Sequence, residues 1–164
     1  GYHAKQRKEL EVLNKALMLG FDYKKGVAHA EFLQSEADGN FYLIEVACRV
    51  GGAYIANVLE HAAGFNLWRE WARLETATRE KPYSPPKLRK DFAGICLALA
   101  NADDPDTSHY TDEEIVYRVK KPRHVGLIFR SADRKRIDDL INSYTVRITA
   151  DFLHIEPVKM RHDE

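Results

Sequence analysis

The chain has 164 residues, of which 45% are hydrophobic and 30% charged, so it can form one domain, or one domain with a small appendage, and is too apolar for a disordered protein. Twenty-five Lys and Arg residues balance 25 Asp and Glu residues, and the formal net charge of zero argues against a general binder of nucleic acid or anionic membranes. No apolar stretch approaches the roughly 20 residues that a membrane-spanning helix needs.

The first half of the chain predicts a helix, a β-hairpin and two more helices, in that order. Apolar residues recur at helical spacing in the helices and lie between turn-forming residues in the hairpin. The expected elements are a helix over 4–19, strands over 26–33 and 41–48, a helix after Gly51 and Gly52, and a helix capped by Asn66.

Composition changes over 78–90, where prolines and charged residues indicate a linker. It separates a first domain, 1–77, from a second domain, 91–164. The apolar run 92–100 permits a helix, but its length and turn-rich flanks favour a strand. The order predicts a small antiparallel α+β domain with one covering helix. Its expected elements are strands over 92–100, 114–119 and 124–129, a helix capped by Ser131, and a final strand over 145–155.

The two cysteines, Cys48 and Cys96, both lie inside apolar runs. We interpret them as buried free thiols, which are typical of a reducing compartment. The expected location is therefore cytoplasmic.

Alternation along the hairpin places Glu31 and Glu45 opposite one another. Two facing carboxylates repel unless a cation lies between them, and oxygen ligands suit Mg²⁺ or Mn²⁺. Arg49 and the backbone N–H groups of Gly51 and Gly52 would complete a polyphosphate site. On spacing alone, a charged face that simply meets solvent remains an open alternative. The expected faces are Val27, His29, Glu31 and Leu33 on the first strand, and Phe41, Leu43, Glu45 and Ala47 on the second.

Two segments resemble the metal-binding end of the ATP-grasp superfamily. They are Gly-Val-Ala-His-Ala-Glu-Phe over 26–32 and Tyr-Leu-Ile-Glu-Val-Ala-Cys-Arg-Val-Gly-Gly over 42–52. The segment Ala-Ala-Gly-Phe-Asn-Leu over 62–67 is also similar to the family. The resemblance implies an α+β fold: the C-terminal ATP-grasp subdomain, an antiparallel hairpin with packed helices, followed by the small α+β domain. This part of the chain is similar to the corresponding part of amino-acid ligases, carbamoyl-phosphate synthase-like enzymes and biotin carboxylase-like enzymes.

The resemblance also implies an activity and roles for particular residues. The family activates a carboxylate as an acyl phosphate with Mg-ATP and joins it to an amine or similar nucleophile. By resemblance, Glu31 and Glu45 bind Mg²⁺ or Mn²⁺, Arg49 is catalytic and contacts phosphate, and Gly51 and Gly52 help to bind ATP. The family's usual Asn, two residues after the second Glu, is Ala47 here.

The family's glycine-rich loop and ATP-binding lysines do not occur in this chain, so we expect it to be a C-terminal fragment that is inactive alone. The expected partners are small-molecule carboxylate and amine substrates, the N-terminal part of the same protein and a second copy in a homodimer, with neither nucleic acid nor membrane. The alternative function is a non-catalytic interaction or dimerisation module.

Two further groups of residues are weaker candidates. His29 is either a third ligand or proton carrier, or a packed strand histidine. The loop with Asp103, Asp104 and Asp106 is interpreted as solvated rather than as a cation site.

Overall fold

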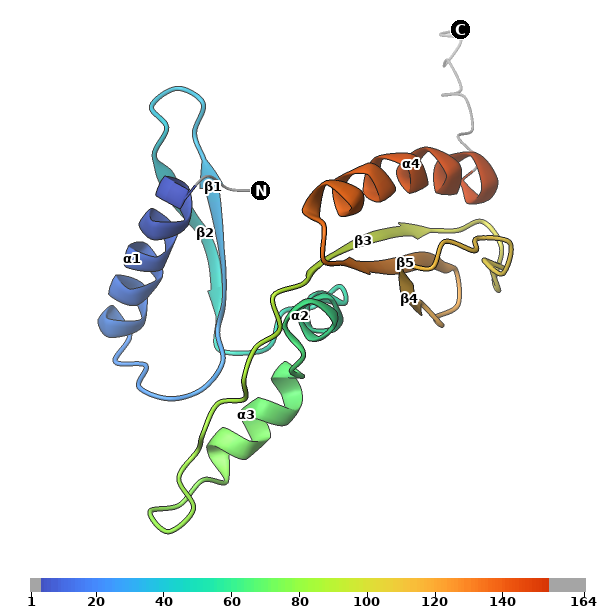
Figure 1. The fold of residues 1–164 in the computed structure, drawn as a ribbon. Helices are drawn as coiled ribbons and strands as arrows, with labels where there is room; N and C mark the ends of the chain where they lie inside the picture. Colours follow the sequence, from blue (N-terminus) through green and yellow to red (C-terminus); the bar gives the residue numbers. More distant parts are fainter. Residues whose placement is uncertain (1–3, 154–164) are drawn as a thin grey trace, which may run out of the picture. The chain divides into compact units, whose positions relative to one another are not determined.

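The computed structural model describes residues 4–153. These residues form an α+β protein with antiparallel pairing in both of its sheets, which confirms the expected fold class (Figure 1). The chain divides into two compact units. The first comprises Gly1–Asn57 and Phe65–Lys87, and the second comprises Val58–Gly64 and Leu88–Glu164.

The first unit begins with helix α1, Ala4–Gly20, which accompanies a hairpin of strands β1, His29–Gln34, and β2, Phe41–Ala47 (Figure 1). The leucines of α1 at helical spacing are half-buried, and the side-chain amide of Gln6 donates to the Gln34 side chain at 2.7 Å. Strand β1 begins three residues later than expected. Gly26 has φ +134°, and the Tyr23 hydroxyl donates to the Val27 carbonyl, so this segment stays in a turn.

A β-bulge interrupts the hairpin register. Glu31 pairs with Glu45, whereas Phe32 pairs with Leu43, so Ile44 is the extra residue. The bulge reverses the alternation beyond it, and the expectation that Leu43 and Phe41 share a face with Glu45 is wrong. The extra residue leaves the pairing of the two glutamates unchanged.

Two helices follow the hairpin: α2, Ile55–Ala63, and α3, Leu67–Glu75. Helix α2 starts later than expected because Ala53 and Tyr54 both have positive φ, at 48° and 62°, which no helix accommodates. The expected cap of α3 is confirmed, since the Asn66 side chain accepts from the Arg69 N–H at 3.0 Å.

The second unit contains a sheet in the order β3-β5-β4, formed by β3, Phe92–Leu99, β4, Ile115–Arg118, and β5, His124–Ser131. Helix α4, Arg134–Phe152, packs across one face of this sheet (Figure 1). Strand β3 confirms the expectation that the apolar run 92–100 forms a strand and not a helix. The core between sheet and helix contains Cys96, Val125, Leu127, Phe129, Ile137, Leu140, Tyr144 and Ile148.

Helix α4 differs from the expectation at both ends. Its N-cap is Asp133, whose side chain accepts from the Lys135 N–H, while Ser131 accepts from the Asp133 N–H outside the helix. The expected final strand over 145–155 is wrong as far as residue 153, because the helix continues through Phe152; the last two residues of that strand lie outside the described part of the chain.

A set of polar contacts, here called the clasp, fastens the loop before β4 to α4. The Tyr144 hydroxyl donates to Asp112, while the Arg136 guanidinium donates to both Asp112 and Glu114. The Arg147 guanidinium lies 4.4 Å from the centre of the Tyr144 ring, in cation–π geometry. The loop is therefore held by charge-assisted hydrogen bonds rather than by apolar packing alone.

Both cysteines are free, as expected, but Cys48 is exposed and only Cys96 is buried. The expectation of a buried Cys48 is wrong because β2 ends at Ala47, which places Cys48 in the bend beyond the sheet. Within residues 4–153, no helix combines the length and the apolar character required to cross a membrane.

Candidate metal and phosphate site

The candidate site lies on the hairpin face that carries the two glutamates. Glu31 and Glu45 are directly opposite each other in the antiparallel register. Side chains directly opposite in such a pair have Cβ atoms about 5 Å apart. Both side chains are open to solvent, with 52% of Glu31 and 60% of Glu45 exposed. The two carboxylates can therefore approach one ligand from the same side of the sheet.

Each carboxylate has one basic neighbour. His29, two residues before Glu31 on the same strand, places its Nδ1 atom 3.7 Å from Glu31 Oε1. Arg49 places its Nη2 atom 4.0 Å from Glu45 Oε1, and its Nη1 atom donates to the Val50 carbonyl at 3.1 Å. These separations are long for ion pairs, and both carboxylates and Arg49 are at least half-exposed while His29 is 24% exposed, so the contacts contribute little to stability. The half-exposed Arg49 guanidinium remains accessible to an incoming anion.

The glycine segment after β2 lies against His29. A Cβ atom added to Gly51 would lie 3.3 Å from His29 Cδ2 and from Ile55 Cγ2, closer than side-chain contacts normally are. A side chain here would crowd His29 and Ile55, which would have to shift by a few tenths of an ångström. The sequence did not predict this contact, because strand alternation places His29 on a face without locating the segment beyond β2. Gly51 thus brings the backbone close to the carboxylate face.

Gly52 has open space around its Cα, and its carbonyl accepts from the Ile55 N–H at 2.9 Å. The left-handed residues Ala53 and Tyr54 separate it from the first turn of α2. A separate turn therefore lies between the glycine pair and α2, and the glycines do not form the N-terminus of the helix. No sequence signal marks this turn, because neither alanine nor tyrosine favours positive φ.

The donor set determines what this site could hold. Within the described residues, no group of three or more His, Cys, Asp or Glu side chains is arranged to hold a metal ion. Glu31 and Glu45 fit Mg²⁺ or Mn²⁺ only as two of six oxygen ligands, with water and phosphate oxygens completing the octahedron. This is the usual mode of Mg²⁺ in enzymes that bind nucleotides, and it makes binding of metal and phosphate interdependent.

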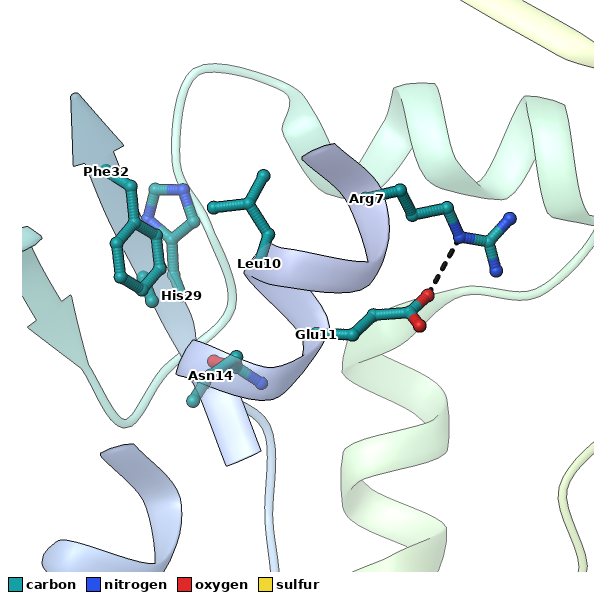
Figure 2. A pocket seen from close by; sticks show the side chains of 8 residues that line it. Arg7, Leu10, Glu11, Asn14, His29 and Phe32 are labelled. Atoms are coloured by element: carbon teal, nitrogen blue, oxygen red, sulfur yellow. Dashed lines mark hydrogen bonds and ion pairs between the residues drawn. The ribbon is translucent and has the colours of Figure 1, made fainter. Parts of the chain in front are cut away.

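A groove of about 610 Å³ lies between α1 and β1. Figure 2 shows Leu10 and Phe32 beside His29, whereas Arg7 and Glu11 turn away and form an ion pair at 2.8 Å. Phe32 lies on the sheet face opposite to Glu31, whereas His29 lines the groove and also lies beside Glu31, so the groove borders the carboxylate face. Because no residue of α1 is fully buried, the groove reflects loose packing of this helix on the hairpin.

The aspartate loop after β3 is solvated, as interpreted from the sequence. The Asp103 side chain is 91% exposed and lies 3.8 Å from the Arg123 guanidinium, and Asp106 accepts from the backbone and hydroxyl of Ser108. The neighbouring Arg118 donates to backbone carbonyls of the same loop, so it holds the loop in place.

Comparisons with known proteins agree with this fold. No protein-family model matches the chain, and no curated protein matches it. Among solved structures, the L-amino acid ligase from Bacillus licheniformis matches with a TM-score of 0.70 and 12% identity, over 96% of this chain. The match spans 42% of the ligase chain, so this chain corresponds to less than half of that enzyme. This chain therefore shares its fold with the corresponding part of that ligase, and the fold that the resemblance implies is confirmed.

Proposed function

We propose that this chain is the metal- and phosphate-binding C-terminal part of an ATP-dependent ligase of the ATP-grasp kind. The reaction would join a carboxylate to an amine or similar nucleophile. A carboxylate oxygen bonds to the γ-phosphorus of ATP and ADP leaves. The nucleophile's nitrogen then bonds to the acyl carbon, phosphate leaves, and the nitrogen loses a proton. The amino-acid ligase that shares this fold supports a reaction of this class.

Each site residue has a role in this proposal. Glu31 and Glu45 hold Mg²⁺ or Mn²⁺, which neutralises phosphate charge when bound. Arg49 contacts a phosphate oxygen, because its guanidinium is half-exposed and loosely paired with Glu45. Gly51 and Gly52 allow the backbone to approach the phosphates. His29, which lies opposite Ala47 in the register, takes up the space beside Glu31 and orients its carboxylate.

The pairing of Glu31 with Glu45 is the observation on which the proposal depends. Two like charges directly opposite in a hairpin destabilise it, so stability of the fold alone does not account for them. A divalent cation between them would convert this repulsion into attraction. In the absence of a cation, nothing about a solvent-exposed hairpin requires a carboxylate at both positions.

The test is thermal unfolding of the chain with Mg²⁺ or Mn²⁺, in the presence and absence of ATP. Wild type is expected to be stabilised by metal and nucleotide together, while Glu31→Gln and Glu45→Gln lose the response. Glu36→Gln, a substitution in the exposed turn of the same hairpin, is the matched control and should keep it. A wild-type melting temperature that is indifferent to metal and nucleotide, or a response unchanged in both site variants, would contradict the proposal.

We also propose that this chain alone does not turn over ATP, because the glycine-rich loop and lysines that the family uses to grip the nucleotide are absent from its sequence. Purified chain should release no ADP above background with Mg-ATP and candidate amino acids. ATP hydrolysis that Glu45→Gln abolishes and Glu36→Gln preserves would show that this part of the proposal is wrong.

A further inference from the structure

Strand β3 forms one edge of the sheet in the second unit. The order β3-β5-β4 leaves one side of β3 without a paired strand among residues 4–153. Its eight residues, Phe92–Leu99, include no charged side chain and no proline. Every residue of β3 pairs with β5 in unbroken register, so the strand has no bulge. The outer edge is therefore a regular row of backbone donors and acceptors.

Natural proteins usually protect such an edge with a charge, a proline or a bulge. Strand β4, the other edge of this sheet, has this protection, because it carries a bulge between Ile115 and Tyr117 and ends in Arg118. Strand β3 has none, and its side chains add apolar surface, since Leu97 is 37% exposed and Leu99 is 67% exposed. The contrast within one sheet indicates that the edge of β3 is suited to pairing.

We propose that the edge of β3 pairs antiparallel with β3 of a second copy of this chain, joining the two sheets into one. A two-fold axis perpendicular to the sheet generates this arrangement, and it keeps equivalent sheet faces on the same side. Residues directly opposite each other across the two copies must then have their side chains on the same face of the joined sheet. Centring the axis on Cys96 meets this requirement and places Ile95 opposite Leu97 of the second copy.

Charges on either side of β3 favour a second copy as the partner. Basic residues, Arg89 and Lys90, precede the strand, and acidic residues, Asp103 and Asp104, follow it. Asp91, directly before the strand, lies 3.8 Å from the Arg130 guanidinium, which offsets its charge. Antiparallel self-pairing brings the basic flank of one copy towards the acidic flank of the other, twice by symmetry. The side chains of both flanks, Arg89, Lys90, Asp103 and Asp104, are exposed. Because β3 has no charged side chain, its self-pairing places no like charges opposite each other within the strand.

Sedimentation analysis of the purified chain over a wide concentration range tests this arrangement. The expected result is a concentration-dependent dimer that is independent of metal and nucleotide, so its failure is distinct from failure of the proposed function. Leu97→Lys and Leu99→Lys should each give a monomer with unchanged circular dichroism. The matched control is Val146→Lys, which replaces an apolar residue that is 71% exposed on α4, and this variant should still dimerise.

A mixing experiment tests the geometry directly. Residue 97 of one copy lies diagonally across from residue 97 of the other, roughly 7–8 Å away, which is within reach of long side chains. Leu97→Lys and Leu97→Glu should each be monomeric alone, and an equimolar mixture should form a heterodimer. A monomeric wild type, a dimer that survives both lysine substitutions in β3, or a mixture that stays monomeric would overturn the proposal.

Discussion

Replacing Tyr144 with Phe removes one hydroxyl group from the interior of the second unit and leaves the packing of the ring in place. The ring is fully buried, with ring centroids 4.9 Å from Tyr110 and 4.8 Å from Phe129. Its hydroxyl donates to the carboxylate of Asp112, which is 31% exposed. A hydrogen bond to a charged group contributes about 1.5–3 kcal/mol, and partial exposure of the acceptor favours the lower part, about 2 kcal/mol.

In a domain of the size of the second unit, a loss of about 1 kcal/mol lowers the melting temperature by roughly 4–8 °C. Tyr144→Phe should therefore lower the melting temperature of this unit by roughly 8–16 °C. Far-UV circular dichroism during urea or thermal unfolding measures the change. Both tryptophans, Trp68 and Trp71, lie in the first unit, so their fluorescence provides a separate signal for that unit. The control is Tyr42→Phe, which removes a hydrogen bond to Asp38 on the exposed hairpin and should change stability little.

The effect of Tyr144→Phe should also depend on pH. The hydrogen bond from Tyr144 holds the pKa of the Asp112 carboxyl below its usual value of 3.8, and Arg136 acts in the same direction. Because the pKa is lower in the folded chain, the stabilisation is fully present above pH 3.8 and is lost as the pH falls through the folded value. The difference between variant and wild type should therefore be largest at neutral pH and shrink in strong acid. A difference below about 0.5 kcal/mol at pH 7 would refute this account of the clasp, since surface substitutions commonly fall within that range.

Three further predictions follow from local geometry. Asp133→Ala should lower the free energy of unfolding by about 1 kcal/mol, because it removes the acceptor for the Lys135 N–H at the start of α4, and chemical denaturation measures this loss. Ala53→Gly should raise the free energy of unfolding by up to about 1 kcal/mol in the same assay, since φ is +48° at this position, and a decrease would contradict the left-handed conformation. A thiol reagent should modify exposed Cys48 rapidly and Cys96 only after unfolding, because burial shields that thiol and raises its pKa; two fast thiols in the native chain would contradict the fold.

The pairing of the hairpin could be predicted from the sequence because a turn and two alternating segments determine which residues face each other. For this reason, the prediction that Glu31 lies opposite Glu45 is confirmed. The bulge at Ile44 could not be predicted, because alternation counts residues in steps of two and contains no signal for a single extra one. The bulge lies next to the glutamates, and only the residues on its far side, Phe41 and Leu43, changed face.

The end of α4 shows how tertiary packing overrides local preference. The segment from Thr145 to Thr149 contains several β-branched residues, which favour a strand when considered alone. In the structure, Tyr144 and Ile148 continue the buried stripe of the helix, four residues apart, and pack on the sheet. Burial of this stripe outweighs propensity differences of a few tenths of a kcal/mol per residue. The contact of Gly51 with His29 escaped prediction for a related reason, because it depends on the path of a bend.

The glutamate pair is better suited to a ligand than to the stability of the hairpin. An apolar or oppositely charged pair at these positions would contribute about 0.2–1 kcal/mol, whereas like charges directly opposite are destabilising. The basic neighbours His29 and Arg49 stay at 3.7 and 4.0 Å, too far from the carboxylates to offset the repulsion fully. Departures from the most stabilising choice are typical of functional sites, where a ligand supplies the missing interaction. With two carboxylates and a guanidinium exposed on one face, a cation carrying its own anionic oxygen ligands would supply this interaction, which supports the proposed metal–phosphate ligand over a metal ion alone.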